Sequence, residues 1–493
     1  MLEPILTALS GESVVDAPLL LAGSWVRDGA LHERTGPHAR RTVSRATYAD
    51  EGVVRRAVEY AHSSARRVAA LAPAARASML ESAAMLAVEH RRPFARLIAL
   101  ELGKPVKDGL SEMDRVADTL AVCAAEARQI GGELLPVAGW ARGIGNTAMT
   151  YRAPAGIALA ITPFNAPANL LAHKLGASFA AGNTTIVKGP PQAPAVTAGI
   201  VALLLEAGMP VEAVQLLHGG GDVGAWLCAA PEISVVSFTG SAATGAAVAR
   251  AAGAKRLVLE LGGNAATIVC EDADVDLAAT ICARTGYSNS GQSCISVQRV
   301  YAHRSVFDQF VAAFAGAVAK LKVGDPLDEH TDVGSMVDDN AAERVLAWAH
   351  EAAGAGATIA LGGRRDGATL LPTVVVDPPP DAAVVQQEVF GALVAVLPYD
   401  DLDAVVSACN ASRFGLQAGV FTRNIDRIIA LWRDLEVGGL IVNGSSNFRL
   451  DHVPFGGVKD SGFGRETPRS MIEDFTVVKT LLLRGLSVWG EAS

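Results

Sequence analysis

The chain has 493 residues, of which half are apolar and 19% are charged. A chain of this length exceeds a single hydrophobic core and predicts two or three packed domains. Its formal net charge of -9 at pH 7 argues against a nucleic-acid-binding protein, because the phosphate backbone attracts basic surfaces. A small molecule is therefore the expected partner.

Six cysteines are spread singly along the chain, without a CxxC pair or a histidine cluster at metal-ligand spacing. We expect neither a bound metal nor a disulfide framework, and this pattern is typical of a reducing compartment. The first residues, MLEPILTALSGES, have no basic residue before their apolar positions, and no apolar run reaches about 18 residues. The sequence thus predicts a cytoplasmic protein without a membrane span.

The first half of the chain predicts helices followed by an alternating α/β segment. Residues 50 to 130 carry an apolar stripe opposite charged positions, as solvated helices do. Beyond residue 155, short apolar runs alternate with alanine-rich helical stretches, and the predicted strands are 156–164, 184–189, 213–219, 234–240 and 256–263. Apolar strands joined by helices predict a parallel sheet covered on both faces, which is a doubly wound, Rossmann-like unit.

The alternation resumes after residue 265 and predicts a second α/β domain. Its expected strands include ATIVC (266–270), VQRVYAH (297–303) and LQAGVF (416–421), with a helix over 306–321. Residues 362–380 are rich in glycine and proline, and we expect them to form surface loops.

Parallel sheets of this kind bind ligands at the carboxyl ends of their strands, where this chain has two glycine-rich loops. HGGGDVGAWL contains Gly219, Gly221 and Gly224 at GxGxxG spacing, which by itself is a weak signal for a dinucleotide. FTGSAATG contains Gly240 and Ser241 and opens a predicted helix whose N-terminal amides could face a phosphate.

Three further residues have two interpretations each. Lys188 ends a predicted strand and suits a ribose or its phosphate, but an edge lysine that reaches water fits equally well. Glu260 ends another strand, where burial would raise its pKa and suit it to general-base catalysis, whereas a structural ion pair is the commoner role. Cys294 lies in NSGQSCISVQ among small side chains that leave room for a substrate, although a lone cysteine is usually inert.

A series of ordered motifs connects these residues. TPFNAP, AGNTTIVKGP, SFTGSAATG, LELGGN, GQSC, QEVFG, VNG and PFGGVKDSGFGRE follow one another along nearly the whole chain. In this order they resemble the aldehyde dehydrogenase family. The resemblance implies the α/β aldehyde dehydrogenase fold, with a Rossmann-like cofactor domain (1–128 and 148–261), an α/β catalytic domain (262–470) and a small bridging β element (129–147 and 471–493). That element, whose strand FTVVKTLLL is highly apolar, implies a homodimer or homotetramer.

The resemblance also implies a mechanism. Cys294 corresponds to the family's nucleophile, Glu260 to its general base, and Asn165 to a donor that holds the oxyanion together with the Cys294 backbone N–H. The thiolate attacks an aldehyde, hydride passes to a nicotinamide, and Glu260 activates the water that hydrolyses the thioester. The implied cofactor contacts are Thr162, Phe164, Lys188, Gly221, Gly240, Ser241, Leu261, Glu388 and Phe390.

The cofactor is expected to be NAD or NADP. Three residues after Lys188, where members that prefer NAD commonly have a glutamate, this chain has Pro191. Without that carboxylate, nothing at this position repels the 2′-phosphate of NADP.

The expected substrate is a small polar aldehyde. Glu260 at the base position favours hydrolysis to a free acid, and the stretches DHVPFGGVKDSGFGRE and GQSCISVQRV resemble the lactaldehyde, non-phosphorylating glyceraldehyde-3-phosphate, phosphonoacetaldehyde and succinate-semialdehyde dehydrogenases. Arg115 and Arg449 match positions near the family's substrate, and guanidinium groups suit carboxylate or phosphate, so we expect an anionic or hydroxylated aldehyde. Ser293 precedes the cysteine where several phosphate-using members have arginine, and Arg115 could equally be a structural helix residue.

Other functions stay open from the sequence. The same mechanism could act on neutral or aromatic aldehydes. A reductase that forms acyl-coenzyme A is disfavoured by Glu260, and a dehydrogenase without a covalent thiol would not need Cys294. A non-catalytic protein of the same fold would not need Asn165, Glu260, Cys294 and Glu388 together.

Overall fold

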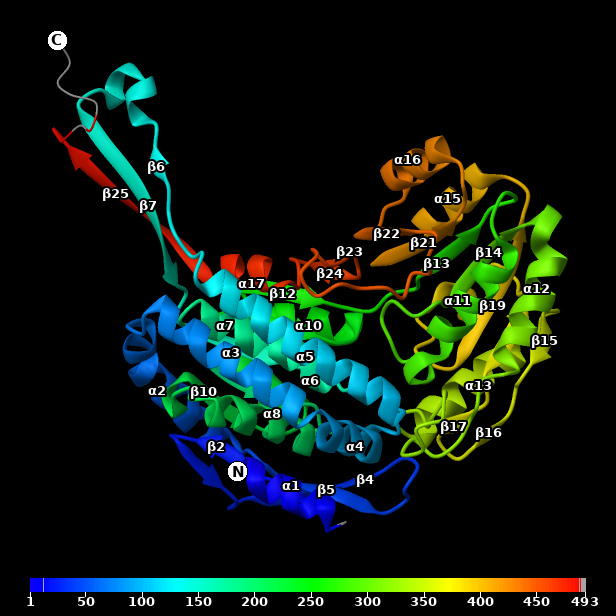
Figure 1. Cartoon of the computed structure of the whole chain (residues 1–493), viewed down its shortest axis with the longest axis horizontal. Helices are drawn as coiled ribbons and strands as arrows, with labels where there is room; N and C mark the ends of the chain where they lie inside the picture. Colours follow the sequence, from blue (N-terminus) through cyan, green and yellow to red (C-terminus); the bar gives the residue numbers. More distant parts are fainter. Residues whose placement is uncertain (12, 487, 489–493) are drawn as a thin grey trace.

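The computed structural model describes residues 1–11, 13–486 and 488. Two α/β lobes lie side by side, and a narrow three-stranded arm projects from the first of them (Figure 1). Among the described residues, no helix combines the length and the apolar character that crossing a bilayer requires.

The first lobe is built on an eight-stranded sheet with the order β24-β12-β11-β8-β9-β10-β2-β3. Its strands are β2 (Leu19–Leu21), β3 (Ser24–Val26), β8 (Ile157–Ile161), β9 (Thr184–Lys188), β10 (Val214–Leu217), β11 (Ile233–Thr239), β12 (Arg256–Glu260) and β24 (Gly462–Phe463). The five strands predicted from the sequence form its parallel centre, β12 to β10. The predicted doubly wound fold class is therefore confirmed.

Helices cover both faces of this sheet. The elements over one face are α3 (Pro73–Glu89), α4 (Arg91–Leu102), α5 (Val106–Ala127) and α8 (Pro194–Glu206), and those over the other are α2 (Glu51–Ala69), α9 (Gly221–Ala229) and α10 (Ala242–Ala252). Strand β8 shows why both are needed, since Ala158 and Ala160 pack into one core while Leu159 and Ile161 pack into the other. The helices predicted between 50 and 130 are present as α2 to α5.

The second lobe has a seven-stranded sheet with the order β15-β18-β19-β14-β13-β21-β22. Its strands are β13 (Ala266–Val269), β14 (Arg299–His303), β15 (Thr358–Leu361), β18 (Thr373–Val376), β19 (Leu393–Tyr399), β21 (Gln417–Phe421) and β22 (Gly439–Val442). Its main helices are α11 (Val275–Tyr287), α12 (Arg304–Val318), α13 (Asp339–Gly354), α15 (Leu402–Asn410) and α16 (Ile425–Asp434). The predicted second α/β unit is present.

One prediction for this lobe is wrong. Residues 362–380 are not simply surface loops, because β18 lies inside the sheet between β15 and β19 and its Thr373, Val374 and Val375 are buried. The β-branched run TVVV has the strand preference that the neighbouring glycines and prolines concealed.

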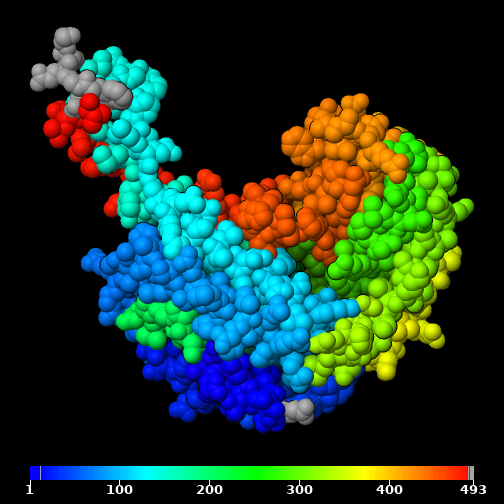
Figure 2. Space-filling view, viewed as in Figure 1, coloured from blue at the N-terminus to red at the C-terminus, as the bar shows by residue number. Residues whose placement is uncertain are grey.

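The arm consists of β25 (Thr476–Arg484), β7 (Asn146–Pro154) and β6 (Leu134–Leu135), paired antiparallel. It stands away from the lobes (Figure 2) and leaves apolar side chains open, with Val478, Leu481 and Leu482 each more than half exposed. The predicted bridging segment began at residue 471, but Met471 and Ile472 belong to α17 (Pro468–Asp474) and pack in the core of the first lobe. Residues 487 and 489–493 of that segment lie outside the described residues.

Candidate active site

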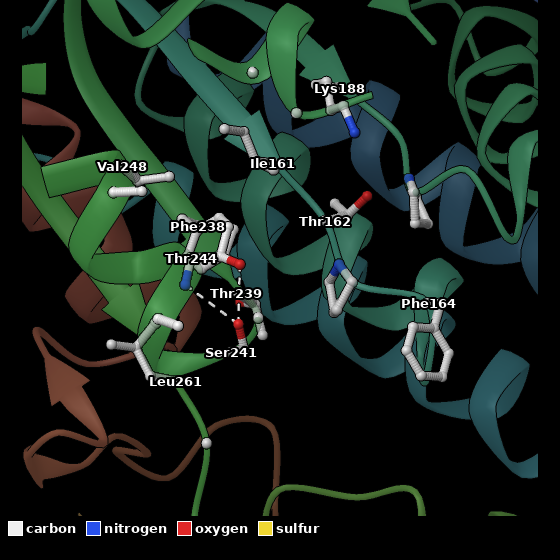
Figure 3. Close-up of a pocket in the computed structure, with 18 of the residues that line it drawn as sticks. Ile161, Thr162, Phe164, Lys188, Phe238, Thr239, Ser241, Thr244, Val248 and Leu261 are labelled. Carbon is white, nitrogen blue, oxygen red and sulfur yellow. Dashed lines mark hydrogen bonds between the residues drawn. The ribbon is translucent and has the colours of Figure 1, made fainter. Parts of the chain in front are cut away.

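A cavity of about 940 Å³ opens at the carboxyl ends of β8, β9 and β11 and runs to the loop after β12. Its size suits a small molecule or a cofactor. Figure 3 shows Thr162, Phe164 and Lys188 on one side of the cavity and Ser241, Val248 and Leu261 on the other. This is the edge at which doubly wound sheets bind nucleotides.

One end of the cavity is formed by the loops after β9 and β10. Lys188 is 7% exposed, and burial lowers the pKa of its ammonium group to about 8. Pro191 lies in the same wall, so no carboxylate occupies that position beside the lysine. Of the glycine-rich loop, Gly221 and Gly224 line the cavity, whereas Gly219 packs against Val223.

The middle of the cavity is formed by the start of α10 and the end of β8. Ser241 caps α10 by accepting a hydrogen bond from the Thr244 N–H, so the helix N-terminus and its partial positive charge face this wall. The buried Thr162 hydroxyl has no hydrogen-bond partner among the described residues. A polar ligand that satisfied this hydroxyl would fit here, and the wall accordingly suits the phosphates of a dinucleotide.

The other end of the cavity brings together Cys294, Asn165 and Glu388. The Glu388 carboxylate accepts a hydrogen bond from the Gly263 N–H at 3.0 Å, and burial raises its pKa to about 7. A Cβ atom on Gly262 would lie 2.3 Å from the Glu388 carboxylate, so a side chain there would have to displace this carboxylate. The segment after β12 therefore passes directly between the two lobes beside the cysteine.

The Cys294 thiol is held in its neutral form. Burial, followed by the nearby Glu388 carboxylate, raises its pKa to about 12. At neutral pH the sulfur is therefore protonated, and a base must remove the proton before the sulfur can attack.

Glu260 ends β12 and is 3% exposed. Both of its carboxylate oxygens lack a hydrogen-bond partner among the described residues. Burial, together with repulsion from Glu466, raises the pKa of Glu260 well above its usual value. A buried carboxyl group without partners is suited to moving protons, because no structural bond has to break first.

A buried ion-pair network lies behind Glu260, and its members were missed in the sequence. Lys174 and Glu466 are both fully buried and 2.7 Å apart, and Arg449 lies 3.1 Å from the same glutamate. Although burial would raise the pKa of Glu466, Lys174 and Arg449 outweigh it and hold the pKa at about 2. Glu466 therefore stays ionised beside a second buried carboxyl group, Glu260.

The two arginines predicted near the substrate are joined through Asp451. Arg115 donates two hydrogen bonds to this carboxylate, at 2.8 and 2.7 Å, and Arg449 lies 3.6 Å from it. His173 also contacts Asp451 at 2.9 Å. The Arg449 guanidinium stacks on the Phe455 ring at 4.1 Å, and that ring packs in the apolar cluster that Cys294 borders. Phe455 thus links Arg449 to the apolar cluster that Cys294 borders.

The structure brings most of the predicted site residues to one cavity. Its lining includes Asn165, Cys294 and every predicted cofactor contact, namely Thr162, Phe164, Lys188, Gly221, Gly240, Ser241, Leu261, Glu388 and Phe390. Glu260, Arg115, Ser293 and Arg449 do not line it. Two signals could have revealed the missed network: Lys174 is a charged residue in the apolar segment ANLLAHKLGASFA, and Glu466 closes the motif PFGGVKDSGFGRE.

One further group of metal-ligand type residues occurs in the described part of the chain, formed by Cys270, Glu271 and Asp272. Arg427 donates hydrogen bonds to both carboxylates of this group. We assign these residues to an ion-pair cluster, because the guanidinium already neutralises the carboxylates.

The fold and the cavity define a doubly wound α/β protein with a nucleotide-type cavity that ends on a cysteine. The family model described as aldehyde dehydrogenase family matches residues 25–481. Two relatives named 3-sulfolactaldehyde dehydrogenase, from Priestia aryabhattai and Priestia megaterium, are 40% identical over 466 residues, which is 94% of this chain and 97% of each relative. The chain belongs to the aldehyde dehydrogenase family, as the motifs predicted.

Solved structures agree with this assignment. Aldehyde dehydrogenase 21 from Physcomitrella patens, in complex with its reaction product succinate, has a TM-score of 0.94 at 31% identity and covers 97% of this chain and 100% of that one. The NADP-dependent glyceraldehyde-3-phosphate dehydrogenase from Bacillus halodurans, complexed with NADP, has a TM-score of 0.92 at 32% identity. The match covers 95% of this chain and 99% of that one. The predicted cofactor class, NAD or NADP, is consistent with the NADP in the second structure.

The protonated state of Cys294 predicts a steep pH dependence of its reactivity. Because its pKa is raised to about 12, the thiolate fraction should grow about tenfold per pH unit between pH 7 and 10. The measurement is the rate of iodoacetamide alkylation of Cys294 in the free protein, followed by peptide mass spectrometry. N-acetylcysteine is the control and should level off above about pH 9. A plateau of the protein rate near pH 8 would contradict the raised pKa.

Proposed function

We propose that this protein uses NAD or NADP to oxidise a small anionic aldehyde to its carboxylic acid through a thioester on Cys294. The observation that carries the proposal is the single cavity that has nucleotide-type loops at one end and Cys294 with Asn165 at the other. Such a cavity lets a cofactor and an aldehyde meet at one sulfur atom.

The cavity residues fit the cofactor. Lys188 would bind the adenosine ribose or its phosphate, the amides at the start of α10 the diphosphate, and Glu388 the nicotinamide ribose. The unpartnered Thr162 hydroxyl is available to the same ligand. Bound NAD or NADP supplies the acceptor for the hydride that leaves the aldehyde carbon.

The protein side chains supply the remaining steps. Cys294 gives its proton to a water molecule as its sulfur bonds to the aldehyde carbon, while the Asn165 amide and the Cys294 backbone N–H donate hydrogen bonds to the oxygen as it becomes negative. Loss of hydride to the cofactor leaves a thioester on the sulfur. Glu260 then accepts a proton from a second water as its oxygen bonds to the thioester carbon, and the carboxylic acid leaves as Glu260 returns that proton to the sulfur.

The partly exposed Arg115 supports an anionic substrate. Arg115 uses its Nε and one Nη for Asp451 and is 35% exposed, so its other Nη is available to a ligand. Two kinds of relative agree with this choice, since one is named for a sulfonated aldehyde and another holds succinate. The alternative substrate, a neutral hydroxylated aldehyde, has the support of relatives named lactaldehyde dehydrogenase, which are 32 to 33% identical to this chain. Ser293, beside the cysteine, adds no charge of its own.

We also propose the division into the cofactor domain (1–128 and 148–261), the catalytic domain (262–470) and the bridging element (129–147 and 471–493). The projecting arm with its exposed Val478, Leu481 and Leu482 supports a homodimer or homotetramer, because such an apolar strand is stable only when another surface covers it. A mass measurement by light scattering that gave a monomer would contradict the assembly.

The general-base role of Glu260 predicts a burst of NAD(P)H formation when this residue is replaced. Glu260→Gln removes the proton acceptor but keeps the shape, so one equivalent of NAD(P)H should form per site before steady turnover falls by about 10² to 10⁴-fold. The measurement is stopped-flow absorbance with 3-sulfolactaldehyde, and mass spectrometry should detect the acyl group on Cys294. Glu206→Gln, at the exposed end of α8, is the matched control and should change neither phase. Unchanged steady turnover in Glu260→Gln would rule out this role.

The proposed binding of the substrate's anionic group by Arg115 predicts that replacing Arg115 raises KM only for anionic aldehydes. Arg115→Ala should raise KM for succinate semialdehyde and 3-sulfolactaldehyde by about 10 to 100-fold, because a charge-assisted hydrogen bond is lost, while KM for butanal should stay within twofold. Arg128→Ala is the matched control, since Arg128 follows the same helix and makes the same two-bond contact with Glu81. Equal effects on anionic and neutral aldehydes would show that Arg115 serves only the structure.

The absence of a carboxylate at position 191 predicts that NADP is accepted. Pro191→Glu should lower kcat/KM for NADP by at least about tenfold, because like charges repel beside the 2′-phosphate, and should leave kcat/KM for NAD within a few-fold. Steady-state kinetics with both cofactors measure the two values. NADP turnover near background in the unchanged protein would overturn this proposal.

A further inference from the structure

A closed set of three hydrogen bonds links the loop that carries Asn165 to the loop that carries Cys294. The Asn289 side-chain amide donates to the backbone carbonyl of Asn165 and to the backbone carbonyl of Gln292, both at 3.1 Å. The Asn165 side-chain amide donates to the same Gln292 carbonyl, also at 3.1 Å. Gln292 lies two residues before Cys294, so Asn289 ties the oxyanion donor to the nucleophile's own loop.

The hydrogen bonds of this set leave one donor free. A carboxamide nitrogen carries two N–H groups, and both of those on Asn289 are used. Asn165 uses one for Gln292 and lines the cavity, so its second N–H remains for a ligand. The Gln292 carbonyl has two lone pairs, which the two asparagines fill. Asn289 thus holds both the Asn165 backbone and the carbonyl toward which the Asn165 amide is directed.

The backbone at Asn289 is shaped for this contact. Asn289, Ser290 and Gly291 have φ values of 49°, 55° and 72°, so three successive residues are left-handed. Such a turn is unfavourable for residues other than glycine, and asparagine tolerates it better than most. The Asp108 carboxylate accepts a hydrogen bond from the Asn289 N–H at 2.9 Å, and the buried Ser290 hydroxyl donates to the Gly334 carbonyl. The strained turn is thus fixed from two sides, and it aims the Asn289 side chain at Asn165.

The Asn165 loop is held from its other side by a buried ion pair. Lys104 donates to the Asn165 carbonyl at 3.2 Å and lies 2.7 Å from Glu112. Glu112 in turn accepts hydrogen bonds from the backbone N–H groups of Ala168 and Asn169. The Asn165 carbonyl therefore has two donors, one from the first lobe and one, Asn289, from the nucleophile's loop.

We propose that Asn289 is a positioning residue that sets the Asn165 amide against the Cys294 N–H, so that both donors face one developing oxyanion. The inference rests on the proposed oxyanion role of Asn165. It goes beyond that role by naming the side chain that fixes the distance between the Asn165 loop and the Cys294 loop.

Asn289→Gly tests this inference, because glycine keeps the left-handed turn and removes only the amide. We expect kcat with 3-sulfolactaldehyde to fall by about 10 to 100-fold, as for a displaced catalytic group, with cofactor affinity and the alkylation rate of Cys294 within twofold. Asn165→Ala should lower kcat by about 10² to 10³-fold. If Asn289 acts through Asn165, the double variant should be no slower than Asn165→Ala alone.

Asn410→Gly is the matched control, since its amide also donates to a backbone carbonyl, that of Asp434, in the second lobe. Its kcat should not change. If Asn289→Gly does not yield folded protein, Asn289→Asp keeps the turn but presents carboxylate oxygens to two carbonyls, and its kcat should fall at least as far.

The outcomes distinguish the positioning role of Asn289 from the oxyanion role of Asn165. Unchanged kcat in Asn289→Gly beside a large loss in Asn165→Ala would overturn the positioning role alone. Losses that multiply in the double variant would also overturn it, because they would show independent effects. Full activity in Asn165→Ala would overturn the oxyanion role and the positioning role together. Equal losses of kcat, cofactor affinity and alkylation rate would show that Asn289 serves only the fold.

Discussion

The close approach of the two lobes at Gly262 and Gly263 is the constraint on which the site depends. A Cβ atom on Gly262 would lie 2.3 Å from the Glu388 carboxylate, and one on Gly263 would lie 2.4 Å from the Cys294 carbonyl. A Cβ at position 263 would strike the Cys294 backbone and one at position 262 would displace the Glu388 carboxylate, so glycine at both positions lets the segment after β12 pass between the lobes without moving either group. This contact brings Cys294, from the second lobe, to the end of a cavity built by the first.

The same close approach of the two lobes explains the raised pKa values in the site. Cys294, Glu260 and Glu388 lie close to where the two lobes meet, and burial raises the pKa of each. With a pKa of about 12, a fraction of about 10⁻⁵ of the Cys294 thiol is ionised at neutral pH. The sulfur is therefore unreactive until a base removes its proton. The cost of burying Glu466 is offset by Lys174 and Arg449. The site therefore keeps one carboxylate ionised by pairing and leaves a second, Glu260, free to exchange protons.

The sequence predicted the parts of this arrangement that follow from local pattern. The five central strands of the first sheet are continuous apolar runs, and the loops after them carry glycine or polar residues, so the ligand edge could be located. Strand β18 was missed because glycine and proline flank its TVVV run. Lys174 and Glu466 are 292 positions apart, and Asn165 and Asn289 are 124 apart, so these contacts exist only after distant segments pack together. A local pattern can mark Lys174 or Glu466 as unusual, but it cannot pair them.

The arginines beside the site show that an arginine can pair with a carboxylate and keep N–H groups for a ligand. Asp451 fixes the guanidinium plane of Arg115 with two hydrogen bonds, whereas Arg449 is fixed by hydrogen bonds to Glu466. A guanidinium has five N–H groups, so a carboxylate that takes two of them leaves the others directed outward. A fixed arginine loses less side-chain entropy when it binds an anion than a free one does. The Asp451 carboxylate thus orients Arg115, and the Phe455 ring beneath Arg449 belongs to the apolar cluster that Cys294 borders.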